Sequence, residues 1–180
     1  TAVEKRRAVD LACRRGCDAC CHVSLALSPV EAASVADALG RLPPPQRGEI
    51  AARAERPRLA AAGQSPPCVL LDARGACGIY ESRPLVCRTQ GLALRYPPGS
   101  FPQEAIMANA GGGGDIVWCP LNFKYAAPAG QDVLEAELVD AMLAVVNLRF
   151  VRCDRDAALR RIALLDIVRA AVPSPTRKGN

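Results

Sequence analysis

The sequence predicts a small, mainly α protein: a helical domain with a cysteine-rich, loop-rich metal site and room for one short hairpin. Three observations support this fold class. Apolar residues make up 50% of the 180-residue chain and charged residues 23%, which is enough to bury a core. Apolar residues recur at helical spacing near both ends. Nine cysteines stand beside a single histidine, and four of them fall within nine residues.

Two helices are predicted in the first quarter of the chain. Residues 1–12 form the first, which leads to the first cysteines, and Gly16 then permits a tight turn. The second begins after Ser28, a good N-cap, with Pro29 at the first helical position and Glu31 completing a capping box.

The middle of the chain is predicted to alternate helix and turn. Gly40 suits the end of the second helix, and three prolines at 43–45 stop any continuation. Residues 46–62 form an Ala/Arg-rich helix that is exposed on one side. Residues 68–80 indicate a small hairpin whose turn places Gly75 at positive φ.

The second half begins irregularly and ends in helices. Residues 81–110 predict no regular element because prolines interrupt them, and four glycines at 111–114 indicate a flexible connection. Residues 131–150 form the clearest helix, whose apolar stripe should make it the most buried. A last helix, N-capped by Asp154, runs to about residue 171 with its apolar side chains, Leu159 among them, facing inward.

This order of elements predicts a domain organisation. We expect a cysteine-rich metal- or cluster-binding domain over residues 1–125, a C-terminal helical pair packing on it over 126–172, and a disordered tail over 173–180. No apolar run reaches about 18 residues, which excludes a membrane span. No signal peptide is recognised, although the printed sequence starts at Thr1 and an upstream segment is left open. The mild charge of +5, scattered arginines and 4% aromatic residues argue against nucleic acid as a partner.

Cysteine is the residue type that decides the class of function. Nine is an odd number, so a complete disulfide framework leaves one thiol over, and the chain is long enough to form a core without such staples. Separations of two or three residues let sulfurs converge on one centre. A metal or cluster site is therefore favoured over disulfides and over inert core thiols. The candidate ligands are Cys13, Cys17, Cys20, Cys21, Cys68, Cys77, Cys87 and Cys119.

Two cysteine motifs follow each other along the chain. The first is Cys13-x3-Cys17-x2-Cys20-Cys21, and the second, after an apolar stretch that starts at Cys68, is Cys77-x2-Tyr80-x2-Arg83-Pro84-x2-Cys87-Arg88; Cys119-Pro120 comes later. In this order they resemble the YkgJ-type family, also called the CxxCxxCC zinc- or iron-chelating domain, over about residues 13–120. The resemblance implies a bacterial cytoplasmic domain that binds iron, often as an iron–sulfur cluster, or zinc. Related domains occur in flagellin lysine methylases that need an iron–sulfur cluster.

The residues narrow the identity of the bound group. A structural zinc takes four ligands and a [4Fe–4S] cluster takes four thiolates, so eight cysteines can serve two centres or one centre with spare thiols. Neighbouring side chains of extended backbone point opposite ways, so Cys20 and Cys21 suit two centres, or two corners of a cluster, better than one metal atom. We expect a 4Fe–4S cluster, with Zn²⁺ as the alternative.

Residues beside the cysteines are candidates for supporting roles. Thiolate-bound clusters are negative and attract amide donors and cations. Arginines next to the cysteines are Arg14, Arg15, Arg83 and Arg88. Of these, Arg88 is expected to face the bound group, whereas Arg14 and Arg15 are expected to be solvated. Tyr80 either hydrogen-bonds a sulfur or packs.

Two further residues invite a functional interpretation. His22 follows Cys21 directly and could be a mixed Cys/His ligand or a proton donor, but a loop histidine facing solvent is favoured because enough thiols exist without it. Cys153 lies outside both motifs, and we expect it to be buried as a small apolar residue.

Three functions compete at this stage. The first is a metal-binding protein that holds an iron–sulfur cluster or iron and serves electron transfer, iron handling or support of an enzyme partner. The second is a structural zinc protein whose apolar helices dock a partner. The third is a cluster-dependent enzyme related to flagellin lysine methylases, for which no catalytic residue can be named because no hydrolase or nucleotide-binding motif is present. A protein partner and a cytoplasmic location are expected.

Overall fold

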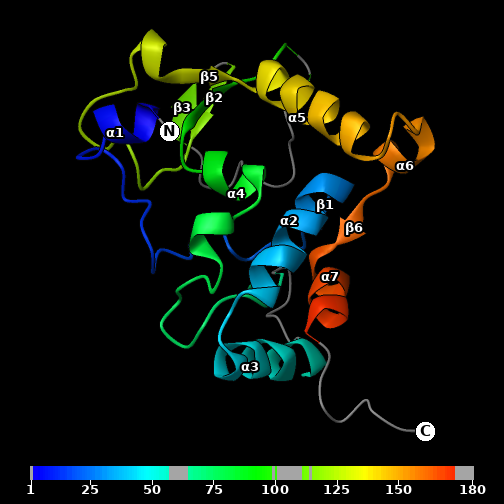
Figure 1. Cartoon of the computed structure of the whole chain (residues 1–180). Coiled ribbons are helices and arrows are strands. Elements are labelled where there is room, and N and C mark those ends of the chain that lie inside the picture. Colours follow the sequence, from blue (N-terminus) through cyan, green and yellow to red (C-terminus); the bar gives the residue numbers. More distant parts are fainter. Residues whose placement is uncertain (1, 57–64, 99, 101–110, 114, 173–180) are drawn as a thin grey trace, which may run out of the picture. The chain divides into compact units, whose positions relative to one another are not determined.

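The computed structural model of the chain describes residues 2–56, 65–98, 100, 111–113 and 115–172, and Figure 1 shows their elements. Two compact units are formed. The first unit consists of Thr1–Cys17 and Leu85–Val145, and the second unit of Asp18–Pro84 and Val146–Asn180. Each unit is therefore assembled from two separate stretches of the chain. The predicted domain boundary at residue 125 stays a prediction, and the predicted tail lies outside the described residues.

Three helices build the second unit (Figure 1). The helix α2 (Pro29–Gly40) contacts α7 (Leu164–Ala171), and α7 also contacts α3 (Pro44–Glu55). The start of α2 is the one predicted: the N–H and the hydroxyl of Ser28 both donate to the Glu31 carboxylate, at 3.3 and 2.8 Å. The third predicted helix, expected over 46–62, begins within the proline run and ends at Glu55, because Arg56 has an extended backbone; residues 57–62 of that prediction lie outside the described residues.

The hydrophobic core of the second unit lies between these helices. Its most buried large side chains, each 1% exposed or less, are Leu27, Val35, Leu39, Ile50 and Val168. The short strand β1 (Ala26–Leu27) pairs antiparallel with β6 (Ile162–Ala163) at the edge of this core. Cys68 and Cys77 are partly buried against the core, so their backbone positions depend on it.

The predicted last helix is two helices separated by a strand. Asp154 caps α6 (Arg155–Leu159), with its Oδ1 accepting from the Ala157 N–H at 3.0 Å, as predicted. After α6 the chain becomes extended as β6, because its backbone pairs with β1 instead of continuing the helix. The prediction of one helix is therefore wrong, and Leu159, expected to face inward, is 75% exposed.

A four-stranded sheet with the order β3-β4-β2-β5 organises the first unit. The central strand β2 (Ala93–Arg95) is antiparallel to β4 (Ile116–Trp118) and parallel to β5 (Val133–Glu135). The edge strand β3 (Gly111–Gly113) pairs antiparallel with β4. This sheet makes the fold mixed α/β, and the prediction of a mainly α protein is corrected accordingly.

Two stretches expected to lack regular structure contain elements of it. Glycines 111–113, predicted as part of a flexible connection, form β3, because glycine contributes main-chain groups to a ladder as other residues do. The region predicted as irregular includes the 3-10 helix η1 (Tyr80–Ser82), the helix α4 (Leu85–Thr89) and β2. Its residues 101–110 lie outside the described part of the chain.

The clearest predicted helix starts later and is less buried than expected. The 3-10 helix η2 (Gly130–Asp132) and β5 precede α5 (Ala136–Phe150), because residues 133–135 join the sheet. An apolar stripe follows α5 at helical spacing, but its members are 51–63% exposed: Leu138, Met142, Val145, Val146 and Phe150. We call these five residues the α5 stripe. The described residues leave it uncovered, so the prediction that this helix is the most buried is wrong.

A buried carboxylate anchors the N-terminal segment in the first unit. The helix α1 (Ala2–Arg6) is shorter than the predicted residues 1–12, and the chain turns after it. Arg6 Nη2 lies 3.1 Å from Asp132 Oδ1, and Arg7 Nε lies 3.6 Å from Asp132 Oδ2. Asp132 is 1% exposed. These ion pairs hold the start of the chain against η2.

Within the described ranges, no helix has both the length and the apolar character that a membrane span requires.

Asp132→Ala is expected to lower the free energy of unfolding by roughly 1–3 kcal/mol, because it removes the buried carboxylate that pairs with Arg6 and Arg7, while Arg7 keeps its ion pair with Asp10 at 3.1 Å. Urea denaturation of the reduced, metal-free protein, followed by circular dichroism, measures this loss. Asp156→Ala, at an exposed position of α6, is the matched control and should change stability by less than about 0.5 kcal/mol. Equal urea midpoints for the two variants would contradict the anchoring role.

Candidate metal centre

The eight predicted ligands divide equally between the two units. The first unit contains Cys13, Cys17, Cys87 and Cys119. The second unit contains Cys20, Cys21, Cys68 and Cys77. All nine cysteines lie in the described part of the chain, and all are thiols rather than disulfides. Among the described residues, no three His, Cys, Asp or Glu side chains are gathered closely enough to hold a metal ion. The structure therefore shows which cysteine-bearing segments are connected by hydrogen bonds. The assignment of individual cysteines as metal ligands stays a prediction.

In the first unit, a buried side-chain amide connects the segments that carry the cysteines. Asn122 is 1% exposed. Its Oδ1 accepts from the Ala12 N–H at 2.7 Å, and its Nδ2 donates to Cys13 Sγ at 3.3 Å and to the Gly91 carbonyl. Its main-chain N–H donates to the Cys119 carbonyl at 2.8 Å. An N–H directed at sulfur is the kind of contact that stabilises thiolate ligands.

Gly91 allows the backbone after α4 to approach Cys13. A Cβ at this position would overlap Cys13 Sγ and would lie 2.9 Å from Asn122 Nδ2. Gly91 lies two residues after the last residue of α4 (Leu85–Thr89), the helix that carries Cys87. Cys13 therefore lies close to the end of the helix that carries Cys87.

The remaining contacts of the first unit fix the chain around Cys17 and Cys119. Cys17 closes a turn in which its N–H donates to the Arg14 carbonyl at 3.0 Å and Gly16 has φ +95°, as predicted. Trp118, which precedes Cys119, packs edge-on against Phe123 with ring centroids 6.1 Å apart. These contacts hold the backbone on both sides of the candidate ligands.

In the second unit, main-chain hydrogen bonds connect the cysteine segments. The Cys68 N–H donates to the Cys21 carbonyl at 2.7 Å, and the Leu71 N–H donates to the Cys68 carbonyl at 3.1 Å. Leu71 and Cys77 form an isolated antiparallel bridge. The small hairpin expected over residues 68–80 is thus present as a single bridge.

Asp72 holds the turn of this hairpin. Its Oδ1 accepts from the Ala76 N–H at 2.9 Å and from the Arg74 N–H at 2.8 Å. These two hydrogen bonds, that from Ala76 first, lower the pKa of the Asp72 carboxyl below its usual 3.8. Gly75 has φ +72°, as predicted for the turn.

The thiol of Cys20 ionises more readily than an ordinary cysteine. A hydrogen bond with the Cys21 thiol is the main cause that lowers its pKa from 9.0 to about 7, the nearby charge of Arg83 adds to this, and burial acts in the opposite direction. Arg83 is itself held in place: its guanidinium lies 3.7 Å from the centroid of the Tyr80 ring, and its Nε donates to the Tyr80 carbonyl at 2.9 Å. A thiol that ionises near neutral pH is a suitable metal ligand.

The predicted supporting residues differ in outcome. Tyr80 packs against the guanidinium of Arg83, and its contact with a bound group stays a prediction. Arg88 is exposed on α4, and its contact with a bound group stays a prediction. The His22 side chain is 47% exposed, 3.9 Å from the Asp18 carboxylate, as favoured for a loop histidine. Arg14 and Arg15 are exposed, as expected.

The prediction that Cys153 is buried is wrong, because the residue is exposed. It caps the C-terminal end of α5, where its N–H donates to the Leu148 carbonyl at 2.8 Å. Both Cys153 and Arg152 have positive φ, at 65° and 56°. This left-handed conformation is typical of helix ends, where the chain turns at the surface.

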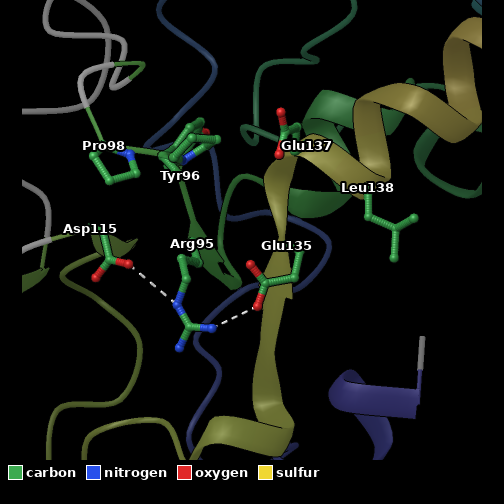
Figure 2. A pocket seen from close by; sticks show the side chains of 8 residues that line it. Arg95, Tyr96, Pro98, Asp115, Glu135, Glu137 and Leu138 are labelled. Atoms are coloured by element: carbon green, nitrogen blue, oxygen red, sulfur yellow. Dashed lines mark hydrogen bonds and ion pairs between the residues drawn. The ribbon is translucent and has the colours of Figure 1, made fainter.

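Figure 2 shows a pocket of 290 Å³ in the first unit. Arg95 lies at its centre, with Nη1 2.7 Å from Glu135 Oε1 and Nε 3.4 Å from Asp115 Oδ2. Tyr96 lines the same pocket, and burial raises the pKa of its phenol. No cysteine lines the pocket, so we do not include it in the candidate metal centre.

The donor set fits a soft metal ion or an iron–sulfur cluster. The candidate ligands are thiols, an amide N–H is directed at one sulfur, and the neighbouring Cys21 thiol, with a smaller contribution from Arg83, lowers the pKa of another thiol. These features define a thiol-rich protein of the metal-binding class.

A family comparison agrees with this class. The family model described as "CxxCxxCC: Putative zinc- or iron-chelating domain" matches residues 12–108, more than half of the chain. The protein belongs to this family. The matched residues include seven of the eight candidate ligands, and Cys119 lies beyond them. No curated protein and no solved structure matches the chain.

Sequence reasoning missed Asn122 and Gly91. Neither residue belongs to a ligand type, and each acts on a sulfur more than 70 residues away in the sequence. The only sequence signal is their position, three residues after Cys119 and four after Cys87.

Asn122→Ala is expected to lower the free energy of unfolding by about 2–3 kcal/mol, because it leaves the buried N–H of Ala12 and the carbonyl of Gly91 without their partner. The measurement is urea denaturation of the reduced, metal-free protein. Gln131→Ala is the control, since the Gln131 side chain is exposed and the substitution keeps the main-chain carbonyl that accepts from Arg6. A wild-type midpoint for Asn122→Ala would show that the amide does not hold these segments.

Asp72→Ala is expected to destabilise the protein most at neutral pH. A carboxyl whose pKa is lowered by folding contributes stability that is present above its unfolded value and is lost as pH falls through the folded value. The difference in unfolding free energy between wild type and variant should therefore shrink as pH drops below the usual 3.8. Urea titrations across pH 3–7 test this, and a difference that stays constant with pH would contradict it.

Proposed function

We propose that this protein binds iron, most favourably as a 4Fe–4S cluster, through its cysteine thiolates, and that it serves electron transfer, iron handling or the support of an enzyme partner. The observation that carries the proposal is the family match, which includes seven of the eight candidate thiols. The family description supports metal chelation by this chain. The choice of an iron–sulfur cluster as the bound group is our proposal.

One hydrogen bond and one nearby positive charge support the choice of a cluster. Iron–sulfur clusters bring negative charge, which N–H donors to sulfur and nearby cations stabilise. Asn122 Nδ2 donates to Cys13 Sγ at 3.3 Å, and the charge of Arg83 acts on the Cys20 thiol. Both features are present in the chain before any metal is added.

A structural zinc protein is the second candidate. The equal division of eight thiols between the units fits it as well as it fits a cluster, since four thiolates also complete a tetrahedral zinc site. A cluster-dependent enzyme related to flagellin lysine methylases stays the remaining alternative, and no observation on the described residues is put forward for it. A cytoplasmic location is proposed because reduced thiols persist there.

The experiment is anaerobic purification followed by metal analysis and an absorption spectrum. We expect iron, acid-labile sulfide and a broad band at about 400 nm. Cys17→Ala and Cys87→Ala should each lose at least half of the bound iron, whereas Cys153→Ala, a cysteine outside both motifs, should retain all of it. A colourless protein that contains zinc would establish the second candidate instead. Unchanged metal content in Cys17→Ala and Cys87→Ala would refute the ligand assignment.

A further inference from the structure

We propose that the chain holds two separate thiolate centres, one within each unit, and not one centre formed from all the motif cysteines. The inference rests on the proposed function and goes beyond it by stating which cysteines act together. Four thiolates complete either a zinc site or a 4Fe–4S cluster. The division of the chain assigns four candidate ligands to each unit.

The first motif consists of two consecutive tight turns, and each turn belongs to a different unit. In the first turn the Cys17 N–H donates to the Arg14 carbonyl at 3.0 Å, and in the second the Cys21 N–H donates to the Asp18 carbonyl at 2.7 Å. The division between the units falls between residues 17 and 18. A motif that looks continuous in the sequence thus delivers one pair of cysteines to each unit.

Contacts within the first unit connect its four cysteines. Asn122 touches Cys13 through its side chain and Cys119 through its main chain. The close approach of Gly91 to Cys13 Sγ brings Cys13 near the end of α4, the helix that carries Cys87. Cys17 follows Cys13 by four residues, across the tight turn that the Cys17 N–H closes with the Arg14 carbonyl. These four residues form the proposed first centre.

Contacts within the second unit connect the other four. Cys20 and Cys21 are neighbours in the turn that the Cys21 N–H closes with the Asp18 carbonyl at 2.7 Å. The Cys21 carbonyl accepts from the Cys68 N–H at 2.7 Å. Cys77 is connected to the Cys68 segment through its antiparallel bridge with Leu71. Cys68 and Cys77 also pack against the same hydrophobic core. These four cysteines form the proposed second centre.

Metal loading must complete both centres by moving sulfur atoms. Among the described residues no three ligand side chains are gathered closely enough to hold an ion. A cysteine side chain has one rotatable bond between Cα and sulfur, so rotation about χ1 redirects the sulfur without unfolding the segments. Ordering of this kind couples metal binding to stability.

The test is an anaerobic titration of the reduced, metal-free protein with Co²⁺, whose bonds to thiolates absorb strongly. The wild type is expected to bind two equivalents, four thiolates for each ion. Cys13→Ser combined with Cys87→Ser should bind half as much, and so should Cys21→Ser combined with Cys68→Ser. All four substitutions together should abolish binding, and Cys153→Ser should bind as the wild type does. Iron and sulfide after reconstitution should follow the same halving.

A second double variant in each unit controls for loss of binding that is caused by misfolding. Cys17→Ser with Cys119→Ser in the first unit, and Cys20→Ser with Cys77→Ser in the second, must give the same halving, with wild-type circular dichroism as the check on folding. A wild type that binds one equivalent, a double variant that loses all binding, or one that loses none would each overturn the two-centre inference while metal binding itself stands. A wild type that neither carries metal on isolation nor binds Co²⁺ would instead overturn the proposed function.

Discussion

The first unit depends on one buried amide. Asn122 satisfies its carbonyl oxygen with the Ala12 N–H and its amino group with Cys13 and Gly91, while its main chain bonds to Cys119. A buried polar side chain is stabilising only when its hydrogen bonds are made, so these partners must be present together. Three segments that are far apart in the sequence therefore assume one arrangement, and the candidate thiols are positioned as a result.

Local signals in the sequence predicted local structure correctly. The Ser28–Glu31 capping box, the Asp154 cap and the glycine-assisted turn at Gly75 each depend on residues within a few positions of one another. Pairings between distant segments were not predictable in the same way. Nothing in residues 133–135 indicates that they join a sheet through a parallel strand 40 residues earlier. The α5 stripe shows the same limit, because helical periodicity identifies an apolar face and does not state what covers it.

The candidate site shows the same difference between residues that local sequence signals identify and residues whose roles depend on the fold. Spacing identified the thiols, since chelation requires ligands a few residues apart and this is visible in one dimension. It did not identify Asn122 or Gly91, whose roles exist only when the chain brings them to Cys13. Nor did it predict that Cys153 is exposed, because burial depends on the surrounding fold and a helix end can turn its side chain outward. Sequence alone left open how eight thiols are shared, and the two units of the structure suggest a division.

The glycine strand β3 has a consequence for how the edge of the sheet is maintained. Its three residues oppose Trp118, Val117 and Ile116 by main-chain groups alone. In most strands a slip of one residue exchanges the inner and outer faces and is strongly penalised, but a run of identical residues without side chains has no faces to exchange. The register of this edge is therefore specified by no side chain of β3 itself, and only the residues of β4 opposite it have faces that a slip would exchange.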